Sequence, residues 1–359
     1  MNIIPATPAP EYKEIKKWND NKMHSIKDLK GKVILLDFWT YTCIFCLRTI
    51  PTIDRLKKKY EKDGLEVIGI HSAEYDFAKI EENIVKALTT YDQKDTITGF
   101  DTSNKTWEAY GNSYWPKHIL IDKDGFVRYE HPGYGTPEEF EDALSDLLDM
   151  PHTAAATAAN DTNSTSQSFH EEMTSQNKNS YDDESQISNE QNKITRMYGM
   201  HFPGMAPEIC VGYTRLRRFG NNQKVRVEEH NIFSEVSQVM DNVVYLKGKW
   251  FWGKEGISPS FDHKDKNPSI VFKYNSASNV NIITGSSDGK QATADILLDG
   301  KYLEENQLGY HSKLVNGISS VDITWPFLMN IVKTKNREIH KLEILPKTDN
   351  FYFYTFVFG

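Results

Sequence analysis

The stretch VILLDFWTYTCIFC, residues 33–46, decides the fold of the first half of the chain. Its first seven residues form an apolar run of strand length, interrupted only by Asp37, as expected for a strand covered on both faces. Cys43 and Cys46 follow that strand, and apolar residues then recur at helical spacing over Leu47–Tyr60. A strand that leads through C-x-x-C into a helix predicts an α/β domain with a dithiol at the helix N-terminus.

The two cysteines have the spacing that disulfide exchange needs. Cysteines on one helical turn bring their sulfurs close enough to bridge, and the first sulfur faces unpaired N–H groups and the positive end of the helix dipole, which stabilise its thiolate. We therefore expect Cys43 to be the nucleophile and Cys46 the buried resolving thiol. Ile44 and Phe45 between them bring no positive charge, which favours a reducing or mildly oxidising couple over a strong oxidant.

Two other interpretations of this pair stay open. Half of a zinc site is one, although zinc needs four ligands and the chain has no second C-x-x-C. A structural disulfide is the other, but three cysteines are too few for a disulfide scaffold. The third cysteine, Cys210, is expected to be a buried small hydrophobe. We expect no metal, and no cofactor besides the redox-active Cys43–Cys46 disulfide.

Strands and helices alternate over residues 1–150. The apolar run Leu65–Ser72 predicts a second buried strand, and helical spacing recurs over Ala78–Tyr91 and Glu138–Leu148. Residues 118–131 contain two short apolar runs separated by Lys-Asp-Gly, which predicts a β-hairpin. The first domain is therefore predicted to be a small α/β sandwich.

A polar stretch over residues 151–199 divides the chain. It is dominated by Ser, Thr, Asn, Gln, Asp and Glu, and it cannot offset the entropy of its own ordering. We interpret it as a disordered linker, with an acidic or glycosylated interaction tail as the alternative. In residues 200–359 short strands of period two alternate with turn residues, which predicts an antiparallel, jelly-roll-like β-sandwich. There, Ala292–Leu303 and Ser319–Lys333 are each expected to be one strand.

Composition narrows the class of protein. The net charge of -8 argues against nucleic acid as a partner, because such binding needs clustered Lys and Arg. No apolar run approaches the roughly 18 residues of a membrane helix, and the N-terminal residues show no secretory signal. A cytoplasmic location is the expectation from these two observations.

Several motifs carry a family resemblance. Asp37-Phe-Trp before the cysteines, Pro51 after them, and Trp115-Pro116 before the hairpin resemble the thioredoxin fold. The longer phrases FWTYTCIFCLRTIP, GIHSAEY, WEAYGNSYWPKH and APEICVGY resemble the soluble C-terminal portion of DipZ-type proteins. In that family a TlpA-like thioredoxin domain precedes a carbohydrate-binding-module-like β domain, and the location is extracytoplasmic.

The resemblance implies roles for matched positions. Asp37 would be the buried carboxylate that takes the proton of Cys46, a task for which an apolar setting suits a carboxylate. Pro116 would be a cis-proline facing the disulfide, which leaves the backbone of Trp115 free to pair with a substrate chain. A solvated edge-strand Asp and an ordinary turn proline are the alternatives. The side chains expected to contact substrate are Trp39, Tyr41, Ile44, Phe45 and Trp115.

Four further residues are candidates for tuning the site. His71, Glu74 and His118 lie near strand ends beside the cysteines, although loop His and Glu residues are more often solvated. Thr40 matches the T-x-x-C part of a peroxiredoxin site. The proline that such sites carry four residues earlier is Leu36 here, so a thiol peroxidase is a minor alternative.

The β domain raises the question of a ligand. Flat aromatic rings stack on sugars, so a glycan is a candidate partner, but a period-two aromatic stripe is more often sandwich core. Calcium could bind loop carboxylates such as Asp262 and Asp265, although no ligand pattern is readable. The aromatic candidates are Trp250, Trp252, Trp325, Tyr302 and Tyr310.

These observations favour a two-domain protein-disulfide oxidoreductase on the reductant side, with an antioxidant role in cell redox homeostasis. Its partners would be a disulfide-containing protein substrate and an upstream thiol donor, for which the resemblance implies a CcdA-type membrane electron carrier. The alternative from another class is a glycan-binding or scaffolding protein with an accessory redox domain.

Overall fold

The computed structural model describes residues 3–133, 137–150, 194–195, 197–200, 204–261 and 267–359. The chain divides into two compact units, Met1–Asn192 and Lys193–Gly359. The expected linker over residues 151–193 and the candidate calcium ligands Asp262 and Asp265 lie outside the described residues. Among the helices of the described ranges, none combines the length and the apolar composition that crossing a membrane requires.

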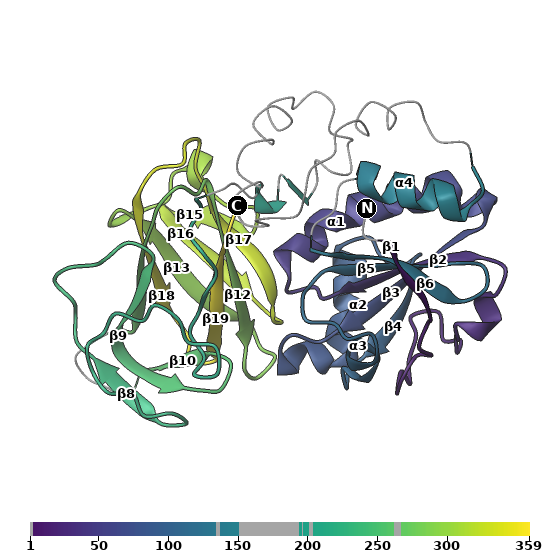
Figure 1. Ribbon diagram of the computed structural model, residues 1–359. Helices are drawn as coiled ribbons and strands as arrows, with labels where there is room; N and C mark the ends of the chain where they lie inside the picture. The colour runs from purple at the N-terminus through teal and green to yellow at the C-terminus, as the bar shows by residue number, and fades with distance from the viewer. Residues whose placement is uncertain (1–2, 134–136, 151–193, 196, 201–203, 262–266) are drawn as a thin grey trace, which may run out of the picture. The chain divides into compact units, whose positions relative to one another are not determined.

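The first unit is built on a mixed six-stranded sheet with the order β1-β6-β5-β2-β3-β4 (Figure 1). Strands β2, β3 and β4 run parallel, whereas β5, β6 and β1 are added antiparallel. The strands are β1 Ile3–Pro8, β2 Val33–Trp39, β3 Leu65–Ser72, β4 Ile97–Asp101, β5 Lys117–Ile121 and β6 Phe126–Pro132. The helices are α1 Ile44–Tyr60, α2 Glu81–Thr90, α3 Lys105–Ala109 and α4 Pro137–Leu147, with 3₁₀ turns at η1 Lys27–Leu29, η2 Glu61–Asp63 and η3 Asp76–Lys79.

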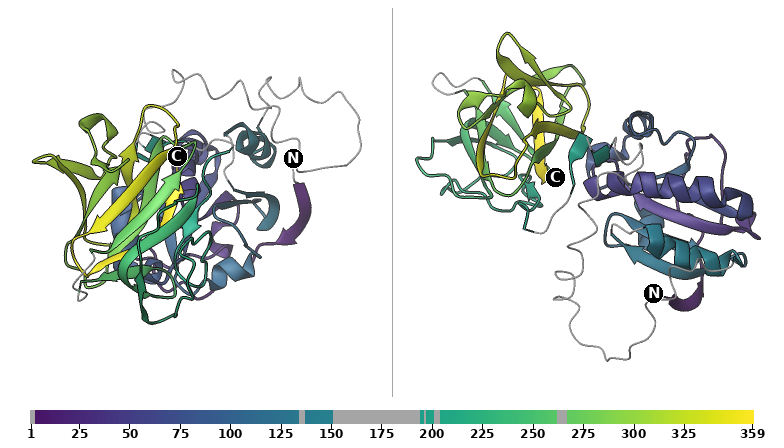
Figure 2. Two further views of the ribbon diagram at one scale, coloured as in Figure 1. Left: turned by 90° about the vertical axis from the view of Figure 1, so that its left-hand side faces the viewer. Right: turned by 90° about the horizontal axis from the view of Figure 1, so that it is seen from above.

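Two apolar cores cover the two faces of this sheet. Leu35 of β2 packs in the core that contains Leu56 of α1 and Phe140 of α4. Its neighbour Leu36 belongs to the core on the other face, which contains Trp107 of α3. Helices α1 and α4 lie on the same side of the sheet (Figure 1; Figure 2). The predicted α/β sandwich is confirmed, and strand alternation directs the side chain of residue 37 toward the α1 side.

The second unit consists of antiparallel strands. Strand β9 pairs with β11 through Lys247 and with β10 through residues 249–252, so it joins the strands of the two halves of the unit. Phe272 of β11 stacks on Phe356 of β19, with ring centroids 4.7 Å apart, which shows that the two halves face each other. The predicted all-β antiparallel unit is confirmed. Its elements are β7 Ile209–Cys210, β8 His230–Phe233, β9 Val243–Trp252, β10 Ile257–Ser260, β11 Ser269–Tyr274, β12 Asn279–Ser286, β13 Ala292–Leu298, β14 Lys301–Tyr302, η6 Glu305–Gln307, β15 Ser312–Val315, β16 Ile318–Ile323, β17 Phe327–Lys333, β18 His340–Pro346 and β19 Phe351–Phe358.

Two expected long strands of this unit are each divided. The segment Ser319–Lys333 forms β16 and β17, because Pro326 between them has no N–H for a ladder. The segment Ala292–Leu303 is a hairpin of β13 and β14, since Asp299 and Gly300 both take positive φ, 52° and 79°, as a tight two-residue turn requires.

The second unit begins earlier than the sequence predicts. Tyr198, which the sequence places in the linker, is buried here. Its hydroxyl donates to the Leu328 carbonyl at 3.0 Å, and its own carbonyl accepts from Asn281 Nδ2 at 3.1 Å. These bonds tie Tyr198 to β17 and β12, so it belongs to the β unit.

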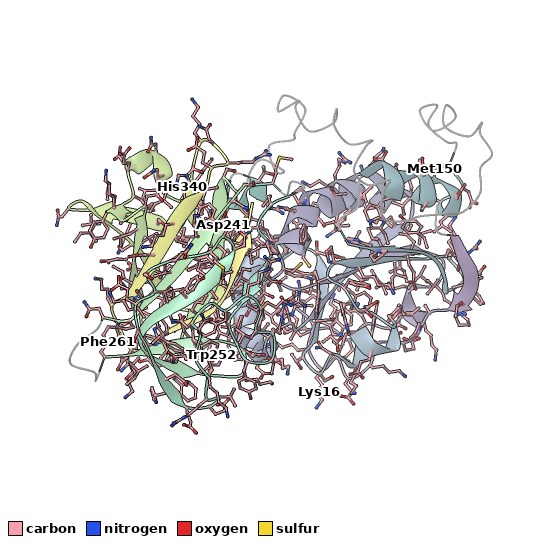
Figure 3. All side chains as sticks on the ribbon, turned by 60° about the vertical axis from the view of Figure 1, so that its left-hand side comes forward. Lys16, Met150, Asp241, Trp252, Phe261 and His340 are labelled. Carbon is pink, nitrogen blue, oxygen red and sulfur yellow. The ribbon has the colours of Figure 1, made fainter. Side chains whose placement is uncertain are left out.

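The tryptophans considered for sugar stacking are mostly core. Trp250 and Trp252 are fully buried, and Figure 3 shows Trp252 among the side chains of the β unit. Trp325 stacks on Phe327 with ring centroids 4.6 Å apart. Tyr302 and Tyr310 are exposed at the surface of the unit.

Candidate active site

The C-x-x-C pair lies where β2 ends and α1 begins. Cys43 is the N-cap of α1, and its sulfur accepts the Cys46 backbone N–H at 3.3 Å, as a side-chain oxygen does in an ordinary cap. Cys43 is half-buried and Cys46 is buried. The sulfur that solvent and substrate can reach is therefore the one at the positive end of the helix dipole.

The environment of Cys46 keeps its proton in place. Burial raises the pKa of the Cys46 thiol well above its usual range, and Cys43 and the carboxylate of Asp37 raise it further. Such a thiol attacks only after a base has removed its proton. Cys43 thus provides the accessible sulfur of the pair, and Cys46 provides the buried thiol that keeps its proton.

A tryptophan-proline segment lies against the first cysteine. The peptide bond between Trp115 and Pro116 is cis, and the Cys43 thiol donates to the Trp115 carbonyl at 3.7 Å. The Trp115 ring stacks on Trp107 at 4.2 Å, and its Nε1 donates to the Ser72 carbonyl at 3.2 Å. This backbone is therefore held at the reactive sulfur by contacts from β3 and α3.

A buried carboxylate supports those contacts. Asp101, at the end of β4, accepts from the backbone N–H groups of Thr106 and Trp107 at 3.2 and 2.8 Å, and from the Ser72 hydroxyl at 3.1 Å. It caps the first turn of α3 and fixes the helix that carries Trp107. Asp101 was not among the predicted site residues, although an Asp a few residues before a short helix is a capping signal.

His71 is a neutral support for the loop before the cysteines. Its ring is fully buried, and burial lowers the pKa of His71 to about 3. Nε2 accepts the Tyr41 backbone N–H at 3.4 Å, and the two rings stack with centroids 5.3 Å apart. The Trp39 ring contacts His71 edge-on at 5.3 Å. The loop between β2 and α1 is thus packed against an uncharged imidazole.

The two threonines of this loop are occupied by local contacts. The Thr42 hydroxyl donates to the Glu74 carboxylate at 2.8 Å and lies 3.2 Å from the Thr40 hydroxyl. The Thr40 carbonyl accepts the Cys43 N–H at 3.1 Å. Thr40 and Glu74 therefore lie in one chain of contacts that fixes the backbone directly before the nucleophile.

The side chains expected to contact substrate divide by exposure. Trp39 and Tyr41 are buried against His71, so they support the loop and do not form its surface, which differs from the expectation. Ile44 is also buried, whereas Phe45 and Trp115 are half-buried. Phe45 and Trp115 are thus the members of the set that reach the surface.

Asp37 and His118 face each other inside the sheet. They are register partners of β2 and β5, and Asp37 Oδ1 lies 3.3 Å from His118 Nε2. Asp37 is 8% exposed and His118 is fully buried. His131 of β6 is the next register partner of His118. His131 was not among the predicted site residues: regular pairing across the predicted turn would set residue 130 opposite His118, and the register shift between Leu120 and Ile121 brings His131 there instead.

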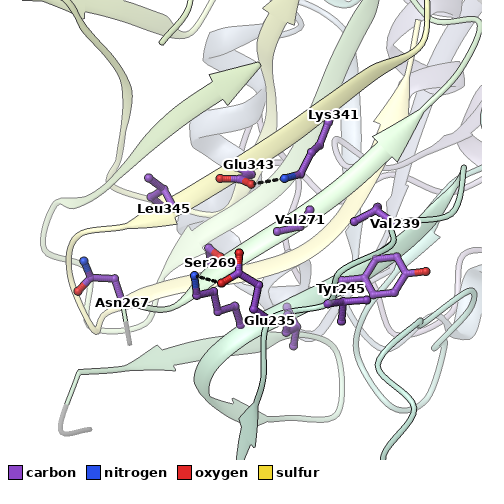
Figure 4. A pocket seen from close by; sticks show the side chains of 12 residues that line it. Glu235, Val239, Tyr245, Asn267, Ser269, Val271, Lys341, Glu343 and Leu345 are labelled. Atoms are coloured by element: carbon purple, nitrogen blue, oxygen red, sulfur yellow. Dashed lines mark hydrogen bonds and ion pairs between the residues drawn. The ribbon is translucent and has the colours of Figure 1, made fainter. Parts of the chain in front are cut away.

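The β unit contains a separate cavity of about 270 Å³. Two ion pairs line it, Lys247 with Glu235 and Lys341 with Glu343, each at 2.8 Å (Figure 4). Tyr245 adds an aromatic ring. In the described part of the chain no three His, Cys, Asp or Glu side chains group as metal ligands.

Comparison with known families supports the division into units. Residues 5–147 match a family model described as Redoxin. Residues 206–359 match a model described as thioredoxin like C-terminal domain.

Comparison with individual proteins points in the same direction. The chain is 39% identical over 143 residues to the protein DipZ of Mycobacterium tuberculosis, a match that covers 39% of this chain and 20% of DipZ. It is 33% identical over 144 residues to the protein SUPPRESSOR OF QUENCHING 1 of Arabidopsis thaliana, covering 40% of this chain and 14% of that protein. It is 34% identical over 128 residues to the thiol-disulfide oxidoreductase ResA of Bacillus cereus, covering 36% of this chain and 70% of ResA. The chain thus spans about a fifth of the length of DipZ and most of ResA.

Proposed function

The chain belongs to the thioredoxin-like thiol-disulfide oxidoreductases, and on this basis we propose that it exchanges or reduces protein disulfides through Cys43 and Cys46. The observation that carries the proposal is the dithiol at the start of α1, with one accessible and one buried sulfur. The cis Trp115–Pro116 backbone beside Cys43 adds a carbonyl that can pair with a substrate strand.

The reaction follows from this geometry. The Cys43 thiolate attacks a sulfur of the substrate disulfide, and the other substrate sulfur leaves as a thiolate. Cys46 then loses its proton and attacks Cys43, which releases the second substrate sulfur and leaves the Cys43–Cys46 disulfide. The substrate is reduced by two electrons, and the enzyme pair is oxidised by two.

A trapping experiment tests the exchange reaction. In Cys46→Ser the second step is blocked, so we expect protein partners to accumulate in a covalent complex with Cys43 that a thiol reductant dissolves. Cys43→Ser should trap nothing and should not reduce the disulfides of insulin. Cys210→Ser is the matched control, because Cys210 is buried in the β unit and should leave both results unchanged. A Cys46→Ser variant that captures no protein would contradict the proposal.

We place the couple on the reductant side. Ile44 and Phe45 between the cysteines contribute no positive charge, which favours a reducing or mildly oxidising couple over a strong oxidant. The reduction potential of the pair decides this point. A value near about -270 mV, as in thioredoxin, supports a reductant, and one near about -120 mV, as in DsbA, contradicts it.

The oxidised pair needs a thiol donor to complete a cycle. We propose a second dithiol protein for this role, with a CcdA-type membrane electron carrier as the candidate that the family resemblance supplies. Re-reduction of the purified oxidised chain by reconstituted carrier is the measurement, and the absence of any electron transfer would exclude that candidate.

The cavity of the β unit favours a second candidate function, the binding of a polar ligand such as a glycan. Its two ion pairs offer charged donors and acceptors to such a ligand. We expect a soluble polysaccharide to bind the full chain and to bind Glu343→Ala more weakly. Equal binding by both proteins, or no binding at all, would remove this candidate.

A further inference from the structure

Three titratable side chains form a row across the sheet of the first unit. Asp37 on β2 is the register partner of His118 on β5, which in turn is the register partner of His131 on β6. The His118 and His131 ring centroids are 6.4 Å apart. Because each residue occupies the same pleat of its strand, all three side chains emerge on one face. This is the face covered by α1, the helix that carries Cys46.

His118, the central residue of this row, is buried, and its ring nitrogens lack hydrogen bonds of good geometry. His118 is fully buried, and neither of its ring nitrogens has a hydrogen-bond partner of good geometry among the described residues. The same holds for Asp37 Oδ1, which lies 3.3 Å from His118 Nε2. Two buried polar atoms that face each other without another partner are best satisfied by a proton held between them.

The groups that face this pair are few. From α1 it is Cys46, whose pKa the Asp37 carboxylate raises. From β6 it is His131, which is half-buried and lies 3.4 Å from the Tyr129 hydroxyl. Helix α4 contributes the apolar Phe140 ring, 5.0 Å from the His118 ring. Within the described residues, the carboxylate–imidazole pair thus lies between the resolving thiol of Cys46 and the half-buried ring of His131 on β6.

We infer that His118 is a positioning residue for the resolving step, in which it holds the proton that Asp37 receives from Cys46. This inference rests on the proposed disulfide exchange. In the mixed disulfide, the S–H bond of Cys46 breaks and its proton passes to the Asp37–His118 pair. The Cys46 thiolate then forms the bond to Cys43, and the bond from Cys43 to the substrate sulfur breaks, so that this sulfur leaves as a thiolate. The imidazole stabilises the proton on the pair and thereby favours the thiolate of Cys46.

The resolving step can be measured by itself with a chromogenic aromatic disulfide. When the reduced full chain reacts with it, attack by Cys43 releases one coloured thiolate and attack by Cys46 releases a second. We expect His118→Leu to slow the second release about tenfold or more at neutral pH, to move its pH midpoint upward, and to leave the first release unchanged. Asp37→Asn should slow the same phase, and the double variant should be no slower than Asp37→Asn.

Two further variants keep the test decisive. His118→Gln retains a polar side chain but cannot hold a proton, so it should slow the second phase even if the leucine variant does not fold. His24→Gln is the matched control, because His24 also contacts a carboxylate, Asp20, at 3.0 Å in the same unit. It should change neither phase.

The outcomes separate this inference from the proposed function. Second-phase rates and midpoints equal to wild type in both His118 variants would overturn the inference, as would slowing of both phases to the same extent. A wild-type chain that releases both coloured thiolates but never reduces a protein disulfide would overturn the proposed function instead.

Discussion

The burial of His71 makes the stability of the redox unit depend on pH. The pKa of His71 is about 3 in the folded chain, because the ring is fully buried, and near 6.5 when unfolded. Between these values the unfolded chain binds a proton that the folded chain does not, so stability falls as the pH drops from about 6.5 toward 3. We expect His71→Gln to flatten this dependence in urea unfolding followed by near-UV circular dichroism. An unchanged pH slope would contradict it.

His311 in the β unit provides an independent case. Burial lowers the pKa of His311 to about 4, while Nδ1 accepts the Asn330 N–H at 2.9 Å. As for His71, the unfolded chain binds a proton below about pH 6.5 that the folded chain does not, so the free energy of unfolding of the β unit falls as the pH drops. His311→Gln should raise the stability of this unit at low pH relative to its stability at neutral pH, with little change in the redox unit.

Site residues could be predicted from the sequence where the groups that act together are close neighbours along the chain. The spacing of Cys43 and Cys46 directly after a strand already indicates a dithiol, and their unequal exposure follows from one helical turn. The row from Asp37 to His131 needs the register of three strands that are distant in sequence. Trp39 and Tyr41 were expected to contact substrate, yet packing against His71 buries both.

At the scale of the elements, the first turn of α3 is held by one side chain, that of Asp101. Asp101 accepts two backbone N–H groups at its first turn and the Ser72 hydroxyl. Asp101→Ala should lower the free energy of unfolding by about 2 kcal/mol, since these bonds go to a charged, buried acceptor. Trp107 would lose its fixed position under Trp115, so the rate of insulin reduction should also fall.

A graded pair of controls checks this prediction. Asp101→Asn keeps an acceptor oxygen and should lose less stability than the alanine variant, and Ser72→Ala should lose least, because it removes one bond. A ranking in any other order would show that the Asp101 contacts do not set the stability of α3.

Long elements were predictable, and so was the hairpin of β5 and β6 with its turn residues, whereas α3 and β4 were not. Strands β2 and β3 are continuous apolar runs, and α1 has a clear helical period, so local pattern alone indicates them. Helix α3 has five residues and β4 has five, too few for a period to emerge. Both are fixed by tertiary contacts such as those of Asp101, which a pattern along the chain does not contain.

On the scale of the whole molecule, the β unit extends beyond the region matched by its family model, residues 206–359. Tyr198 is buried and bonded to β17 and β12. A fragment of residues 194–359 should therefore be more stable than one of residues 206–359 by about 3 kcal/mol, the usual cost of removing a large buried aromatic side chain. Equal thermal midpoints for the two fragments would contradict this.

The unequal burial of the sulfurs also makes the protein a convenient reagent. Of its three cysteines, Cys43 is half-buried, whereas Cys46 and Cys210 are buried. A maleimide dye added to the reduced native chain should therefore attach at Cys43 before the other two, without any mutagenesis. A spectroscopic reporter can thus be attached to Cys43, beside the active-site dithiol, without changing the sequence.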